Sequence, residues 1–126
     1  MNHYIQEVKR IKGICFSNKV QIDLAVNTKK YIETNFDKEI NLDFLAQSLF
    51  TSKFHLIRIF KKYYGVTPRQ YLINKRIEKA KEILKSGISV SETCYTIGFE
   101  SITSFSNLFK AKTGISPSVY KKSNFR

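Results

Sequence analysis

The chain has 126 residues, of which 42% are hydrophobic and 25% are charged, and its longest apolar runs fall far short of the roughly 18 residues that a bilayer-spanning helix needs. Its formal net charge of +12, from 22 Lys and Arg against 10 Asp and Glu, favours polyanions as partners. Lysines and a glycine interrupt residues 1–16, where a secretory signal would need an unbroken apolar stretch, so the sequence predicts a cytoplasmic protein with no membrane contact.

Two segments of the chain repeat each other at a spacing of 49 residues. Each copy has apolar residues at helical spacing, then a glycine, then Ser or Thr followed by proline, which is typical of one helix ending and another beginning. Because a domain of about 60 residues buries only about 60% of its unfolded surface, copies this small should share an element. The matching residues are Phe60, Lys61, Gly65, Thr67, Pro68 and Tyr71 in the first copy, and Phe109, Lys110, Gly114, Ser116, Pro117 and Tyr120 in the second.

Residues 1–20 form an N-terminal arm ahead of the repeats. Tyr4, Ile5, Val8 and Ile11 have helical spacing within it. Packing of this arm on the first lobe is the favoured interpretation, and weak dimerisation through the arm is the alternative.

Residues 21–67 are predicted to form the first lobe. The segment 22–36, with lysines between its apolar residues, predicts an amphipathic helix, and Asn41 is a suitable N-cap for a short helix over 42–48. A third helix is predicted to follow in the same lobe. The inward faces of the three helices are predicted to contain Ile22, Ala25, Val26, Ile32, Phe36, Leu42, Leu45, Ala46, Leu56, Ile59, Phe60 and Tyr63.

The third helix is predicted over 53–64, between an N-cap at Ser52 and a stop at Gly65. Pro68 suits the first turn of a helix and begins a long connecting helix over 68–87. This connecting helix is the element that the two copies are predicted to share.

Residues 88–126 are predicted to form the second lobe. Ser89 opens a short helix, and Ser101 caps a longer one over 102–113. The turn between them is one residue longer than in the first copy, and Gly98 is present only here. The whole pattern predicts an all-α fold of about seven helices: two homeodomain-like, three-helix lobes joined by the connecting helix.

A short helix, a tight turn and a longer helix make a helix-turn-helix, whose second helix enters the major groove of DNA. The outward faces of 53–64 and 102–113 are therefore predicted to contact bases. Phe54 and Ile57 suit thymine methyl groups, although partial burial against the first helix accounts equally well for Phe54. The predicted base contacts are Lys53, Phe54, Ile57, Arg58, Ile102, Thr103, Ser106 and Asn107.

Arg58 and Asn107 occupy matching positions and are the leading predicted base contacts. Arginine pairs bidentately with guanine and asparagine with adenine, so the two halves should prefer different bases; the alternative for each is an exposed polar residue. No acidic residue stands between Asp43 and Glu78 or after Glu100, which favours a phosphate backbone as partner. The predicted phosphate contacts are Lys61, Lys62, Arg69, Arg76 and Lys110.

The histidines and cysteines do not suggest an enzyme. His3 and His55 have no cysteines or paired carboxylates near them in sequence, so neither a catalytic pair nor a metal site can be assembled. For His55, a half-buried ring or a phosphate contact is favoured over catalysis. Cys15 and Cys94 lack metal-type spacing and are predicted to be reduced, with Cys94 in an apolar position equivalent to Ala46. No cofactor is predicted.

The second copy carries Gly98-Phe99, Phe109-Lys110 and the ending Gly114-Ile115-Ser116-Pro117-Ser118-Val119-Tyr120. With these residues, the segment 22–122 resembles the paired helix-turn-helix DNA-binding domain of the AraC/XylS transcription regulators. The resemblance implies a sequence-specific regulator on bacterial nucleoid DNA, usually an activator that contacts RNA polymerase, with two recognition helices in successive major grooves. It also implies a structural or phosphate role for Arg76.

Two features depart from that family's pattern. Asn107 stands where many members have arginine, and only residues 1–21 precede the DNA-binding region where most members carry an effector domain. The chain is therefore expected to be either a short stand-alone regulator, binding DNA as a monomer or weak dimer, or the DNA-binding half of a longer protein. An architectural protein that binds DNA without base preference is the alternative function.

Overall fold

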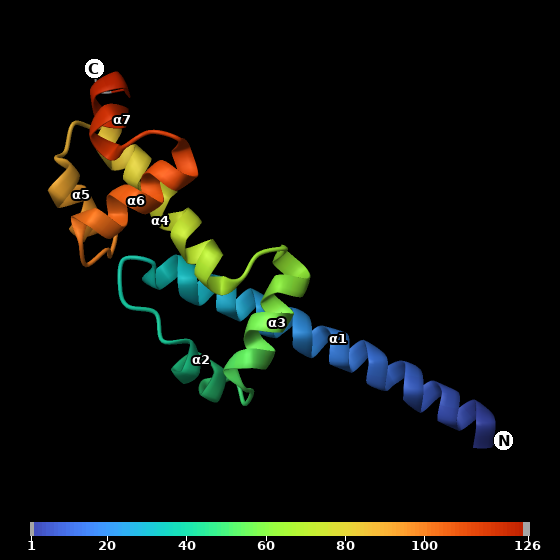
Figure 1. The fold of residues 1–126 in the computed structure, drawn as a ribbon. Coiled ribbons are helices and arrows are strands. Elements are labelled where there is room, and N and C mark those ends of the chain that lie inside the picture. The colour runs from blue at the N-terminus through green and yellow to red at the C-terminus, as the bar shows by residue number, and fades with distance from the viewer. Residues whose placement is uncertain (1, 125–126) are drawn as a thin grey trace. The chain divides into compact units, whose positions relative to one another are not determined.

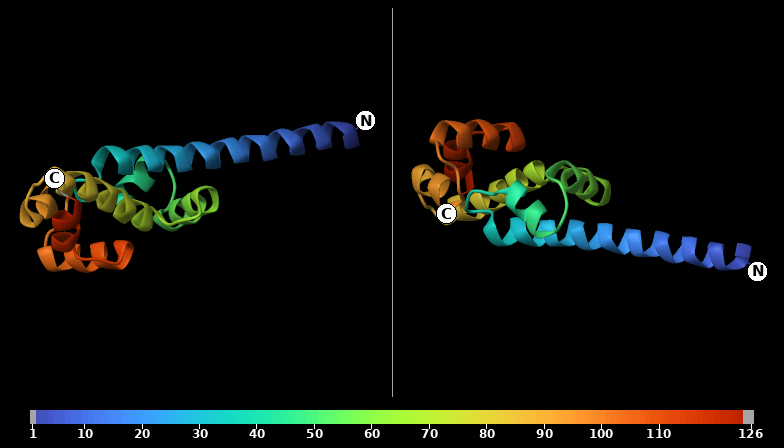
Figure 2. Two further views of the ribbon diagram at one scale, coloured as in Figure 1. Left: turned by 90° about the horizontal axis from the view of Figure 1, so that it is seen from above. Right: turned by 90° about the horizontal axis from the view of Figure 1, so that it is seen from below.

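The computed structural model describes residues 18–124 in full and, over residues 2–17, the course of the helical backbone. The regular structure of residues 2–124 consists of seven helices without a strand (Figures 1 and 2), which confirms the predicted all-α fold. The helices are α1 (Asn2–Asn35), α2 (Leu42–Ser48), α3 (Lys53–Tyr64), α4 (Pro68–Lys85), α5 (Val90–Thr96), α6 (Ile102–Thr113) and α7 (Pro117–Asn124). None of them is long and apolar enough, within the part of the chain described, to cross a membrane.

The first helix differs from the predicted segment 22–36 at its start, because α1 already begins at Asn2. The expectation that Tyr4, Ile5, Val8 and Ile11 pack on the first lobe concerns side chains that lie outside the described residues.

Helix ends follow the capping residues in the sequence. The side chains of Asn41 and Ser52 accept hydrogen bonds from backbone N–H groups three residues ahead, at 3.0 and 3.1 Å, and Ser89 and Ser101 do the same for α5 and α6. Gly65 ends α3 with a φ of 77°, a left-handed conformation that costs glycine little. The predicted caps are thereby confirmed.

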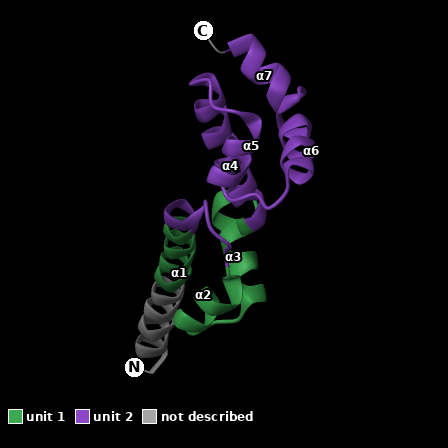
Figure 3. Cartoon of the chain, turned by 90° about the vertical axis from the view of Figure 1, so that its left-hand side faces the viewer, with its two compact units in different colours: residues 1–31, 41–68 green, residues 32–40, 69–126 purple. Residues whose placement is uncertain are grey.

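Two compact units make up the chain (Figure 3). Unit 1 contains residues 1–31 and 41–68, and unit 2 contains residues 32–40 and 69–126. The end of α1 and the loop after it therefore group with unit 2, as does α4 from Arg69 onward, and the chain passes between the units after residues 31, 40 and 68.

The core of unit 1 differs from the predicted one at two positions. Ile22 and Tyr63 were predicted to face inward but are exposed. On α1 the buried stripe runs instead through Leu24, Ala25 and Thr28, whose hydroxyl donates to the Leu24 carbonyl at 2.8 Å and so allows a polar side chain in the core. The buried cluster of unit 1 comprises Leu24, Ala25, Leu45, Ala46, Leu56 and Ile59.

Aromatic side chains from α6 dominate the core of unit 2. Phe105 and Phe109 are fully buried with ring centroids 5.7 Å apart, and Phe109 also meets Tyr120 of α7 at 5.4 Å. Cys94 is a free thiol in this core, and burial raises its pKa. The buried cluster comprises Ile77, Ala80, Leu84, Cys94, Ile97, Phe99, Phe105 and Phe109.

The two helix-turn-helix turns correspond more closely than the sequence suggested. Thr51 N donates to Ala46 O at 2.9 Å, and Phe99 N donates to Cys94 O at 3.1 Å. Gly98, with a φ of 95°, therefore has a positional counterpart in Phe50, with a φ of 58°. The additional residue of the second turn is Glu100, between Phe99 and Ser101, and not Gly98.

Phe50→Asn is expected to stabilise unit 1 by about 1 kcal/mol, because asparagine tolerates the left-handed conformation better than phenylalanine does. The Phe50 side chain is 98% exposed, so its removal costs little burial. Urea unfolding followed by circular dichroism measures the change. Phe44→Asn is the control, since it removes an exposed ring from the helical backbone of α2; a Phe50→Asn midpoint no higher than that of Phe44→Asn contradicts the prediction.

Candidate nucleic-acid interface

The outer face of α3 presents cations and one large apolar side chain. Arg58 and Lys61 are exposed, Lys53 and Ile57 are half-buried, and Phe54 is 78% exposed, which excludes its burial against the first helix. The Lys53 ammonium lies 3.7 Å from the Asp43 carboxylate and 5.5 Å from the Phe54 ring centre. A helix that shows arginine, lysine and an apolar ring to solvent suits a groove lined by phosphates and bases.

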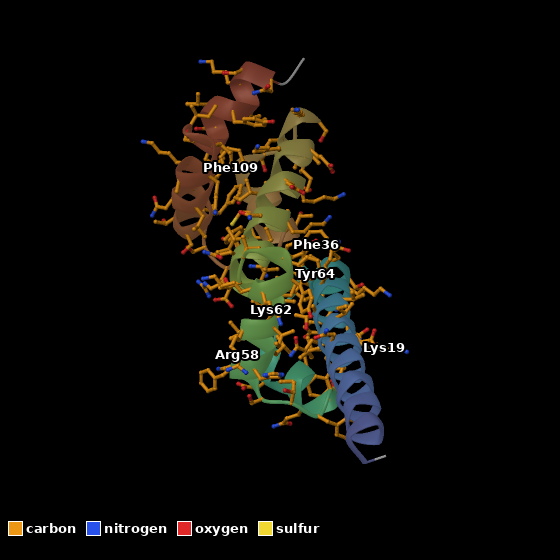
Figure 4. The ribbon with its side chains drawn as sticks, turned by 90° about the vertical axis from the view of Figure 1, so that its right-hand side faces the viewer. Lys19, Phe36, Arg58, Lys62, Tyr64 and Phe109 are labelled. Atoms are coloured by element: carbon orange, nitrogen blue, oxygen red, sulfur yellow. The ribbon has the colours of Figure 1, made fainter. Side chains whose placement is uncertain are left out.

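Two side chains at the end of α3 are held by α1. Lys62 Nζ and Tyr63 Oη both donate to Gln21 Oε1, at 3.0 and 3.2 Å. In Figure 4, Lys62 and Arg58 lie at different positions along the axis of α3. Lys62 retains two further N–H donors, so its predicted phosphate contact stays a prediction.

The outer face of α6 is polar where that of α3 is cationic. Thr103 and Asn107 are exposed, Ser106 is half-buried, and Lys110 is exposed one turn after Ser106. Ile102 is also exposed. On the face of α6 that matches the Arg58 face of α3, the side chains are therefore mostly short groups that can form hydrogen bonds.

Arg76 lies within unit 2 and holds the segment after α1. Its Nε and Nη2 donate to the carbonyls of Phe36 and Lys38, at 2.7 and 2.9 Å, and its guanidinium lies 5.4 Å from the Phe99 ring centre. Burial lowers the pKa of Arg76, while the Asp37 carboxylate opposes that shift. Of the two roles predicted for Arg76, these contacts support the structural one, and its predicted phosphate contact stays a prediction. Arg69 is exposed.

Sequence reasoning missed His55 as a partner of Arg58. Arg58 Nη2 lies 2.8 Å from His55 Nδ1. The sequence contained the signal for this contact, because residues three apart are neighbours on a helix.

Among residues 18–124, no three His, Cys, Asp or Glu side chains are grouped so that they could hold a metal ion.

Each unit thus presents an N-capped helix, following a short helix and a tight turn, with a polar or cationic outer face. This is the architecture of helix-turn-helix DNA-binding proteins. A family model described as a helix-turn-helix domain matches residues 45–123.

Relatives and solved structures agree with this match. The chain is 35% identical over 104 residues to an uncharacterized HTH-type transcriptional regulator in the cgkA 5' region of Pseudoalteromonas carrageenovora, covering 82% of this chain and 62% of that protein. It is 38% identical over 95 residues to the HTH-type transcriptional activator AarP of Providencia stuartii, covering 75% of this chain and 70% of AarP. The C-terminal domain of AraT, a response regulator from Geobacillus stearothermophilus, superimposes with a TM-score of 0.77 at 28% identity, over 82% of this chain and 87% of that domain.

The chain belongs to the AraC family of helix-turn-helix transcription regulators. It is similar to the DNA-binding part of that family and spans less than two thirds of the Pseudoalteromonas relative.

Proposed function

We propose that this protein binds specific DNA sequences and activates transcription, with α3 and α6 each inserted into a major groove. The observation that carries the proposal is the matched exposure of Arg58 and Asn107, which occupy equivalent positions on two N-capped helices. The N-terminal part of such a helix approaches the base edges, which places both side chains within reach of them.

The two helices supply different chemistry to the DNA. The guanidinium of Arg58 matches guanine O6 and N7, and the amide of Asn107 matches adenine N6 and N7. Phe54 and Ile57 suit thymine methyl groups. The proposed base contacts are Lys53, Phe54, Ile57, Arg58, Ile102, Thr103, Ser106 and Asn107, and the proposed phosphate contacts are Lys61, Lys62, Arg69, Arg76 and Lys110.

The partners and location of the regulator are part of the proposal. We expect it to bind DNA as a monomer or as a weak dimer through residues 1–20, to contact RNA polymerase beside its site, and to act at the bacterial nucleoid in the cytoplasm. The name of AarP, a transcriptional activator, supports activation. We propose no catalytic activity, cofactor or metal.

Arg58→Ala is expected to reduce discrimination at one base pair by about 1–3 kcal/mol, because a bidentate contact to guanine is lost. Lys61→Ala is the matched control, since it removes an exposed cation of the same helix at a predicted phosphate contact. That variant should weaken binding to all duplexes alike and lower the salt slope by about one unit. Selection of sites from a random duplex pool, followed by titration of single-base variants, measures both effects.

Equal binding of selected and scrambled duplexes, with a steep salt dependence, would contradict the proposal. That outcome would favour an architectural protein that uses the same charge without base contacts.

A further inference from the structure

The Arg58 guanidinium has a fixed neighbour at the start of α3. Arg58 Nη2 lies 2.8 Å from His55 Nδ1. A guanidinium has no acceptor atom, so Arg58 donates, and the imidazole must carry its proton on Nε2 and leave Nδ1 free to accept. The contact thus defines both the orientation and the tautomer of the His55 ring.

His55 is bonded through its backbone N–H and is less exposed than the arginine that its ring contacts. Its N–H donates to the Ser52 cap at 3.1 Å, and its half-buried side chain lines a hollow of about 340 Å³ in unit 1. The other residues lining this hollow are Val20, Asp23, Leu24 and Asn27 of α1 and Leu49, Phe50 and Thr51 of the turn. Arg58, in contrast, is exposed, and a free arginine has about 2 kcal/mol of rotamer entropy to lose on binding.

We infer that His55 is a positioning residue that holds the Arg58 guanidinium in place for its base pair before DNA arrives. The inference rests on the proposed function, in which Arg58 contacts a base. An orientation that is already restricted in the free protein lowers the entropy lost on binding and disfavours contacts with the wrong base.

The second unit has no such pair, which fits the chemistry of its side chain. Ser104 stands at the position of His55, and its hydroxyl oxygen lies 3.1 Å from Ser101 Oγ, within the cap of α6. Asn107 is short and has few rotamers, so it needs less support than arginine does.

A conservative substitution separates this role from a merely structural one. The side-chain oxygen of an asparagine at position 55 can accept a hydrogen bond as Nδ1 does, whereas a leucine has no acceptor atom.

The test compares wild type, His55→Asn, His55→Leu and Arg58→Ala, with circular dichroism to verify folding. The readout is the ratio of dissociation constants for two duplexes that differ only at the base pair whose preference Arg58→Ala abolishes. His55→Leu should lower this ratio about 2- to 10-fold, the effect of one hydrogen bond. His55→Asn places Oδ1 near the position of Nδ1 and should keep the wild-type ratio.

A wild-type ratio in His55→Leu overturns the positioning role while leaving Arg58 as a base contact. If Arg58→Ala itself changes no base preference, the proposed base contact fails, and the role of His55 fails with it.

Discussion

Phe109→Ala is expected to lower the free energy of unfolding of unit 2 by about 3–5 kcal/mol, the usual cost of truncating a fully buried phenylalanine. The Phe109 ring has no exposed surface and contacts the rings of Phe105 and Tyr120. Alanine would therefore leave a cavity between α6 and α7. Urea unfolding followed by circular dichroism measures the loss. Site selection with the variant should also lose the base preference that we propose for α6.

Phe54→Ala is the control for this experiment, because the Phe54 ring lies on the surface of unit 1. Surface substitutions usually change stability by less than about 0.5 kcal/mol. If both variants unfold at the same urea concentration as the wild-type protein, Phe109 does not belong to the core of unit 2.

Local signals in the sequence predicted the helix ends well. Asn41 and Ser52 bond to N–H groups only three residues away, so their effect depends on nearby residues alone. The face that α1 buries was harder to predict. That face is set by packing against α2 and α3, which follow later in the sequence. In addition, a hydrophobic pattern does not count Thr28 as apolar, although its hydroxyl bonds to its own helix and the residue is buried.

The exposure of site residues could be predicted where the helical period decides it. Contacts between side chains and segments far apart in the sequence could not. Arg58 and Asn107 are exposed, as the register of Phe60 and Phe109 required. The contacts of Arg76 with the loop after α1 join residues about forty positions apart, which no local pattern reveals. The correspondence of Phe50 with Gly98 depends on backbone angles, and a bulky aromatic residue gives no signal for a left-handed conformation.

Gly98→Ala is expected to destabilise unit 2 by about 2–4 kcal/mol, for two reasons that add. At a φ of 95° an alanine is strained wherever it stands. In addition, a Cβ at this position would lie 2.9 Å from the backbone carbonyl carbon of Asp37 and 3.0 Å from Arg76 Nη2. Backbone cannot move aside as a flexible side chain can, so the substitution should disturb the loop that Arg76 holds.

Gly114→Ala separates the two reasons, because Gly114 has a φ of 88° and a Cβ there would meet nothing within 4 Å. It lies in the same unit and should lose only the backbone part, about 1–2 kcal/mol. The difference between the two urea midpoints therefore measures the steric contact with Asp37 and Arg76. Equal midpoints would mean that the loop after α1 is free to shift, and that the hydrogen bonds of Arg76 to Phe36 and Lys38 do not hold it against α4.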